Sequence, residues 1–434
     1  MPTPAPGPEP VPIRCCDLVM KGGITSGVVY PRAVTEIARS FRLRSIGGTS
    51  AGAIAAAAAA AAEFGRLRGM QTGGFRLLER LPEFLGGKLP DGTGNLFALF
   101  QPEPGMRPLF RILTAPLNAR GKSGALLRML TAAVRSFPLG SLAGALPGIA
   151  LGVLAWTSAP GPLRDVSLPL AALLATVGAV AGCAIQATRT AWTRLPAHCF
   201  GICFGMGADG GTTTHGHPPA LTEWLSRYLN ELAGLDPDGP PLTFGQLWDP
   251  ECPAGTQPTP ADPAIRLEMV TSCLSWGRPF RLPFRHDEEL RENRFYFRVE
   301  EFARLFPEPV VRWLAERPRA SNLDGRWIAE GYLPLPDPWN LPVVVATRMS
   351  LSFPVLLAAV PLYAYEQEAH GAERAAAPPR RCWFSDGGIC SNFPIHFFDS
   401  PLPRWPTFAI NLFPKPAGTP AETLARPWMP ADNR

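Results

Sequence analysis

The stretch that decides the fold is Leu43-Arg-Ser-Ile-Gly-Gly-Thr-Ser-Ala-Gly52, with Ser50 near its centre. It predicts a short apolar strand, a G-x-S-x-G turn and then an Ala-rich helix from Ala53. Gly48 and Gly52 remove the Cβ atoms that would clash at such a corner, which turns the serine hydroxyl outward. The free N–H groups of the following helix suit a developing oxyanion. Ser50 is therefore a candidate nucleophile, although Gly/Ser-rich turns before helices are common.

The chain of 434 residues is long enough for one large α/β domain with insertions, or for two domains. Its apolar content of 46% favours a sizeable core. The net charge of +5 is spread along the chain without basic clusters interleaved with aromatics, so no nucleic-acid partner is expected. Nine scattered cysteines without matched C-x-x-C pairs indicate reduced thiols and argue against a zinc site. Neither a metal nor a cofactor is predicted.

The order of segments predicts one domain with two tails. Residues 1–12 are a Pro-rich tail expected to be disordered, and 413–434 are a Pro-rich C-terminal tail expected to fray, whereas 13–412 should form the catalytic domain. Within it, apolar strand patterns alternate with helical patterns, which is typical of the α/β class. Residues Phe302 to Glu316 carry apolar side chains at helical spacing, which predicts core packing and no role in chemistry.

An uncharged region interrupts this domain at residues 136–188. It contains two apolar runs separated by Arg164 and Asp165, and each run is long enough to span a bilayer core. Basic residues flank the region at Arg120, Lys122, Arg128, Arg135, Arg189 and Arg194. By the positive-inside tendency, both outer ends and the catalytic segments face the cytoplasm, which predicts an inner-membrane protein. The alternative is a helical hairpin buried inside a large soluble domain.

Ser50 needs a proton acceptor. The histidines at 198, 215, 217, 286 and 370 lie in Pro-rich or charged loops, and His396 lies in an apolar segment typical of core packing. His215 and His217 also have no acidic or cysteine partner at metal-ligand spacing. Asp386 ends an apolar strand and is followed by Gly387 and Gly388, so its carboxylate is a candidate base. Taken alone, a simple Asp-Gly turn explains this pattern more often.

A second glycine turn, Gly22-Gly23, also follows a strand and precedes a helix. A dinucleotide or phosphate loop is one interpretation, but the spacing is not G-x-G-x-x-G and Ile24 intrudes. Consecutive glycine N–H groups at a helix entry fit an oxyanion-binding loop better.

In this order, the Gly22-Gly23 loop, the G-T-S-A-G around Ser50 and the D-G-G at Asp386 resemble the bacterial members of the patatin-like phospholipase family. The segments 241–248 and 348–354 add to the resemblance, which runs from about Cys16 to Leu412 without the apolar hairpin. It implies a three-layer patatin-like α/β sandwich with a central, mostly parallel sheet, interrupted by an apolar helical hairpin. The chain departs from the family pattern by Ile24 in place of a third glycine and Ser26 in place of a basic residue.

The resemblance also implies a function. Ser50 would attack an acyl ester of a membrane phospholipid or related lipid, and Asp386 would take and return the proton. Backbone N–H groups of Gly22, Gly23 and Ala51 would hold the oxyanion, and water would hydrolyse the acyl-enzyme. The expected partners are a lipid substrate and the bilayer, and the sequence leaves the oligomeric state open. The alternatives are a membrane-anchored binding or scaffold protein without turnover, and a nucleotide-binding module that uses the Gly22-Gly23 turn.

Overall fold

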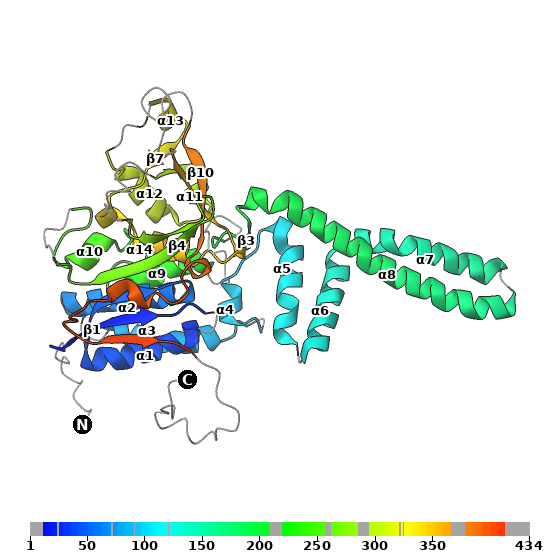
Figure 1. The fold of residues 1–434 in the computed structure, drawn as a ribbon, viewed down its shortest axis with the longest axis horizontal. Helices are drawn as coiled ribbons and strands as arrows, with labels where there is room; N and C mark the ends of the chain where they lie inside the picture. Colours follow the sequence, from blue (N-terminus) through cyan, green and yellow to red (C-terminus); the bar gives the residue numbers. More distant parts are fainter. Residues whose placement is uncertain are drawn as a thin grey trace, which may run out of the picture.

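A computed structural model describes residues 12–412, with gaps at 24–25, 71–72, 91, 120, 159, 208–218, 257–261, 285–294, 321–322, 324 and 366–377. The two predicted tails, except Pro12, and the histidines at 215, 217, 286 and 370 therefore lie outside the described residues. The described part forms a mixed α/β body from which a helical hairpin projects (Figure 1).

A nine-stranded sheet forms the centre of the body, in the order β11-β1-β2-β4-β10-β9-β6-β7, with β5 paired to β4. A separate two-stranded sheet pairs β3 with β8. The strands are β1 (Cys15–Met20), β2 (Arg42–Gly48), β3 (Gly201–Cys203), β4 (Arg266–Cys273), β5 (Arg278–Leu282), β6 (Tyr296–Arg298), β7 (Tyr332–Pro334), β8 (Val355–Leu357), β9 (Val360–Ala364), β10 (Arg380–Asp386) and β11 (Thr407–Ile410).

The sheet has two halves of different direction. β11, β1, β2 and β4 are parallel, whereas β5, β9 and β10 join through antiparallel pairs, as do β6 and β7. The expected α/β class is confirmed, but the sheet is mixed instead of mostly parallel. Short connections such as the one between β4 and β5 allow only antiparallel pairing, because a parallel pair needs a long crossover. The patatin-like three-layer order is not confirmed.

The helices are α1 (Ser26–Ser40), α2 (Ala51–Gly65), α3 (Gly73–Gly86), α4 (Asn95–Ala98), α5 (Arg107–Thr114), α6 (Gly121–Ser136), α7 (Pro138–Ser158), α8 (Gly161–Arg194), α9 (Leu221–Leu232), α10 (Phe244–Trp248), α11 (Val299–Ala303), α12 (Glu308–Glu316), α13 (Gly325–Ala329) and α14 (Val343–Ser350). The core packing predicted for Phe302 to Glu316 is confirmed, because Phe302, Phe306 and Leu314 are fully buried. The chain forms α11 and α12 there, and Pro307 begins the second helix because its ring cannot continue the first.

Helix α2 lies at the centre of the packing. Its alanines from Ala55 to Ala62 are all buried, and the helix contacts β1, β2 and β4 as well as α1, α3, α9 and α14. A helix that is apolar on every side is stable only when it is surrounded, and alanine lets its neighbours approach closely. This packing fixes the N-terminus of α2, where Ser50 lies.

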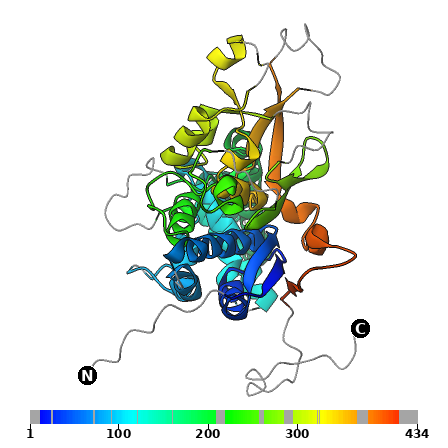
Figure 2. The same cartoon turned by 90° about the vertical axis from the view of Figure 1, so that its left-hand side faces the viewer.

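The predicted apolar hairpin is formed by α7 and α8, and α8 continues to Arg194. The two helices pack through small residues: a Cβ at Gly144 would overlap the carbonyl of Gly178, and one at Gly140 would overlap that of Gly182. The hairpin points away from the body, so that it lies behind the body in the view of Figure 2. The alternative of a hairpin buried in the core is therefore wrong, since large apolar side chains cover its outside.

Candidate active site

Ser50 lies at a strained corner between β2 and α2. Its backbone has φ 56° and ψ −131°, a conformation that L-residues rarely adopt. The two flanking glycines permit this corner, as predicted, because a Cβ at Gly48 would overlap the carbonyl of Gly52 and one at Gly52 would lie 2.8 Å from the Lys21 oxygen. Ser50 is the N-cap residue of α2, yet its side chain does not cap the helix. Its hydroxyl is turned toward β10 instead.

The hydroxyl of Ser50 donates a hydrogen bond to Asp386 Oδ2 at 2.7 Å. The two residues are 336 positions apart, and the structure brings them together at the ends of β2 and β10. The second carboxylate oxygen, Oδ1, accepts the N–H of Gly388 at 2.6 Å. The Asp386 side chain is buried, with 3% exposed. Burial raises the pKa of this carboxyl, while the hydrogen bonds from Ser50 and Gly388 oppose that rise.

The two glycines after Asp386, Gly387 and Gly388, have different structural roles. Gly387 lies against β4, where a Cβ would overlap the carbonyl of Val270. Gly388 donates the N–H that holds the Asp386 carboxylate, and a Cβ on it would lie 2.8 Å from Asp386 Oδ1. The Asp-Gly-Gly sequence is thus a turn, but a turn that aims its carboxylate at Ser50.

The Gly22-Gly23 loop lies beside the serine. A Cβ at Gly22 would overlap the Asn392 side-chain oxygen and lie 3.0 Å from the Ser50 Cβ, so a larger residue there would displace both side chains. The Gly22 N–H donates to the carbonyl of Asn392 at 2.9 Å, so in this structure it holds the loop and does not point at a free oxyanion site. Gly23 is exposed, and Ala51 is the first residue of α2. The oxyanion roles of Gly23 and Ala51 stay predictions, whereas the Gly22 N–H is already bonded to Asn392 in this structure.

Three further residues at this site were missed by sequence reasoning. Asn392 links the glycine loop to the elbow, since its carbonyl also accepts the Thr49 hydroxyl at 3.0 Å. The Ser350 hydroxyl accepts the backbone N–H of Ser50 at 3.3 Å, and the Ser352 carbonyl accepts that of Asp386 at 3.0 Å. The segment 350–352 therefore contacts both members of the Ser-Asp pair. Only the resemblance in 348–354 pointed to this segment, and it assigned no role.

No histidine takes the place of the carboxylate among the described residues. His198 Nδ1 lies 3.1 Å from a carboxylate oxygen of Glu103, and His396 lies edge-on to Phe397. The part of the chain that the structure describes also contains no group of three or more metal-ligating side chains. All nine cysteines are free thiols, as expected.

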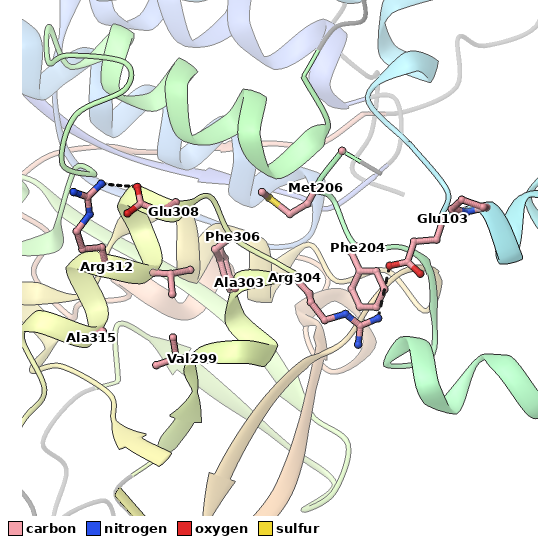
Figure 3. A pocket seen from close by; sticks show the side chains of 13 residues that line it. Glu103, Phe204, Met206, Val299, Ala303, Arg304, Phe306, Glu308, Arg312 and Ala315 are labelled. Atoms are coloured by element: carbon pink, nitrogen blue, oxygen red, sulfur yellow. Dashed lines mark hydrogen bonds and ion pairs between the residues drawn. The ribbon is translucent and has the colours of Figure 1, made fainter. Parts of the chain in front are cut away.

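A cavity of about 740 Å³ lies away from the Ser-Asp pair. It is lined by the residues that follow β3 and by helices α11 and α12 (Figure 3). Its lining is mainly apolar but includes two ion pairs, Arg304 with Glu103 at 3.7 Å and Arg312 with Glu308 at 2.5 Å. Neither Ser50 nor Asp386 lines it. The cavity is therefore distinct from the Ser-Asp pair.

Comparison with known proteins identifies the relatives of this chain. The RpoH suppressor of Rhizobium meliloti (strain 1021) is 38% identical over 472 aligned residues, which cover 98% of this chain and 70% of that protein. The chain belongs to the RpoH suppressor family. No protein-family model matches it, and no solved structure matches it. The assignment to the patatin-like phospholipases is therefore wrong: no such family model is matched, and the relative carries a different name, which states no enzymatic activity.

Proposed function

We propose that this member of the RpoH suppressor family is a serine acyl hydrolase that cleaves ester bonds of membrane phospholipids or related lipids. The observation that supports the proposal is the 2.7 Å hydrogen bond from the strained Ser50 to the buried Asp386. A serine on a sharp strand-to-helix turn, in contact with a sheltered base, is the arrangement that nucleophilic acyl transfer needs. The proposal rests on this geometry and not on a family name.

In the proposed reaction, Ser50 Oγ attacks the ester carbonyl carbon while its proton passes to Asp386 Oδ2. The oxyanion forms beside the N-terminus of α2, where the Ala51 and Gly23 N–H groups are the candidate donors. Collapse of the tetrahedral intermediate breaks the ester bond, and the leaving alcohol takes the proton from Asp386. Water then attacks the acyl-enzyme with Asp386 again as the base, which releases the carboxylic acid and restores Ser50.

Turnover of a soluble fluorogenic acyl ester by the purified chain tests the proposal, with Ser50→Ala as the comparison. The second candidate function is a membrane-anchored scaffold without turnover, which the hairpin alone would support. Equal hydrolysis by the wild type and Ser50→Ala would favour the scaffold.

The fall of kcat/KM at low pH should reflect the protonation of Asp386. A base must be ionised to accept the Ser50 proton, so kcat/KM should fall as the pH drops through the pKa of this carboxyl. Burial raises that pKa, which places this fall above the ordinary aspartate value of about 3.9. The pH profile with a non-ionising ester measures it, with circular dichroism as the check on folding. A rate that stays flat down to about pH 4 would contradict the assignment of Asp386 as the base.

We further propose that α7 and α8 span the inner membrane and leave the body in the cytoplasm. Both helices are long and apolar enough to cross a membrane. Their buried residues are small, such as Gly148 and Ala171, whereas leucines and valines cover the outside. This pattern suits a hairpin surrounded by lipid. The basic residues flanking the hairpin support the cytoplasmic side. We likewise propose that the body is arranged in three layers around its central sheet.

Carbonate extraction of membranes tests whether α7 and α8 span the bilayer. The wild-type chain should stay in the membrane pellet, and Leu173→Arg with Val177→Arg on the exposed face of α8 should release it. Each arginine at the centre of a span costs about 2.5–3.5 kcal/mol of insertion free energy. Leu402→Arg, at a leucine of the body that is 87% exposed, is the matched control and should stay in the pellet. Release of the wild-type chain by carbonate would contradict the proposal that α7 and α8 span the membrane.

A further inference from the structure

The hairpin is preceded by a second helical pair, α5 and α6, joined by a turn at Ala115–Asn118. In Figure 1 this pair runs across the long axis of α7 and α8, between the body and the start of α7. Helix α6 contacts α5 and α8, and none of its 16 residues is buried. A helix with no fully buried residue gains little from packing, so its exposed apolar surface needs another explanation.

The exposed surface of this pair is apolar in part. Leu117 is 71% exposed, Leu126 is 54% exposed and Leu127 is 64% exposed, and Leu113 and Met129 are exposed as well. Large exposed apolar side chains concentrated on one short helical pair and its turn mark a surface that meets a partner or a membrane.

The same pair carries charge of one sign. Between Pro104 and Ser136 the sequence contains no aspartate or glutamate. The basic residues in this interval are Arg107, Arg111, Arg120, Lys122, Arg128 and Arg135. Exposed leucines next to a purely basic set are the composition of helices that lie in the interface of an anionic bilayer. A nucleic-acid surface would not need the leucines.

The position of the pair agrees with this interpretation. Arg164 lies over the Trp156 ring at the far end of the hairpin, 5.2 Å from its centroid, and Trp192 is 83% exposed near the other end of α8. At about 1.5 Å per residue, α8 rises about 42 Å between Arg164 and Trp192. A bilayer with its headgroups is about 40–45 Å thick, and tryptophans prefer its two interfaces. In the proposed spanning orientation the Trp192 end lies at the headgroup level. There Arg194 lies against Gly105, two residues before the start of α5.

We propose that the α5–α6 pair lies flat on the cytoplasmic headgroup layer and binds anionic phospholipids. Its leucines would insert between the headgroups, and the exposed Arg107, Arg111, Lys122 and Arg135 would contact lipid phosphates. The inference rests on the proposed spanning of α7 and α8, because that insertion sets the level of the pair. It adds a lipid-selective contact that places the catalytic body against the surface holding its substrate.

Photo-crosslinking in the full-length chain tests the proposal. Benzoylphenylalanine replaces Leu127 on α6, Leu173 on α8 or Leu402 on the body, one at a time, after reconstitution into phosphatidylcholine vesicles with phosphatidylglycerol. We expect lipid adducts at positions 127 and 173 and none at 402. Adducts at 173 without adducts at 127 would overturn this inference and leave the spanning hairpin standing. Adducts at neither position would overturn both, and a protein or nucleic-acid adduct at 127 would overturn the lipid assignment.

The preference of the α5–α6 pair for anionic headgroups can be measured separately, from the composition of the lipid adducts. The share of phosphatidylglycerol among the adducts at position 127 should exceed its share in the vesicle. Each basic side chain near an anionic surface enriches anionic lipid about fivefold at most. Lys122→Gln with Arg135→Gln should lower that enrichment severalfold, with the adducts at position 173 unchanged. Arg312→Gln, an exposed arginine of α12, is the control. Equal enrichment in the wild type and the double variant would contradict anionic recognition by this pair.

Discussion

Replacing Ser50 by alanine should lower the hydrolysis of a fluorogenic acyl ester by about 10⁴-fold or more. The variant removes the atom that forms the acyl-enzyme. The adjacent Ser350 hydroxyl cannot replace it, since it is buried and accepts the Ser50 N–H. The fold should persist, because the Ser50 side chain does not cap α2. Alanine also lacks the hydroxyl that a serine-directed phosphonate labels, so covalent labelling followed by mass spectrometry gives a readout independent of turnover.

Ser400→Ala is the matched control, because Ser400 is an exposed serine on the same body. It should retain wild-type activity and labelling. Retention of activity by Ser50→Ala would remove the hydrolase proposal, and labelling at another serine would relocate the nucleophile.

Asp386→Asn should lose about 10²–10⁴-fold in rate, since the amide cannot accept the Ser50 proton. Its stability should hold or rise. The folded state binds the Asp386 proton more tightly than the unfolded chain does, because burial raises the pKa. The stabilisation linked to this group is therefore complete below the unfolded pKa and is lost as the pH rises through the folded pKa. At neutral pH the neutral amide avoids that loss, so thermal unfolding that is unchanged or later, together with lost turnover, would separate catalysis from folding.

The parts of the site that could be predicted from the sequence are the positions where only a few residue types fit. The glycines around Ser50 and after Asp386 are needed where the backbone turns against a neighbouring carbonyl, and such positions are visible as G-x-S-x-G and D-G-G. The apolar hairpin was equally visible, because an uncharged run of that length has few other uses. The meeting of Ser50 with Asp386 required the assumption that β2 and β10 end at the same place in the sheet.

Other features could not be predicted because they depend on tertiary pairing. The antiparallel half of the sheet is set by short connections whose strands look like any buried strand. Asn392 acts through its backbone carbonyl, which every residue has, so its side chain gives no signal. The bond that occupies the Gly22 N–H likewise depends on a residue 370 positions away in the chain. The resemblance of three short motifs did not establish the family, because motifs of this size describe a local geometry that unrelated chains can share.

Replacing Arg348 by methionine should lower the free energy of unfolding by about 3–5 kcal/mol. The guanidinium is fully buried, and it donates to the Ser352 hydroxyl at 2.5 Å and to the carbonyls of Ala358 at 2.9 Å and Phe204 at 3.1 Å. Burial lowers its pKa to about 10, so it stays charged at neutral pH, and no ion pair with a carboxylate is found among the described residues. Methionine would fill much of the space but leave these three acceptors without their donor. Urea-induced unfolding in detergent micelles measures the change.

The same substitution should also lower kcat, because Arg348 holds the segment that contacts both members of the Ser-Asp pair. The Ser352 hydroxyl is bound by Arg348, and its carbonyl holds the Asp386 N–H, so a loosened Ser352 moves the base relative to the nucleophile. A displacement of about 1 Å costs up to about 10²-fold in rate. Arg312→Met, in an exposed ion pair with Glu308, should change stability by less than about 1 kcal/mol and leave kcat unchanged. Wild-type kcat in Arg348→Met at a temperature where it is folded would show that Arg348 supports the fold without positioning the base.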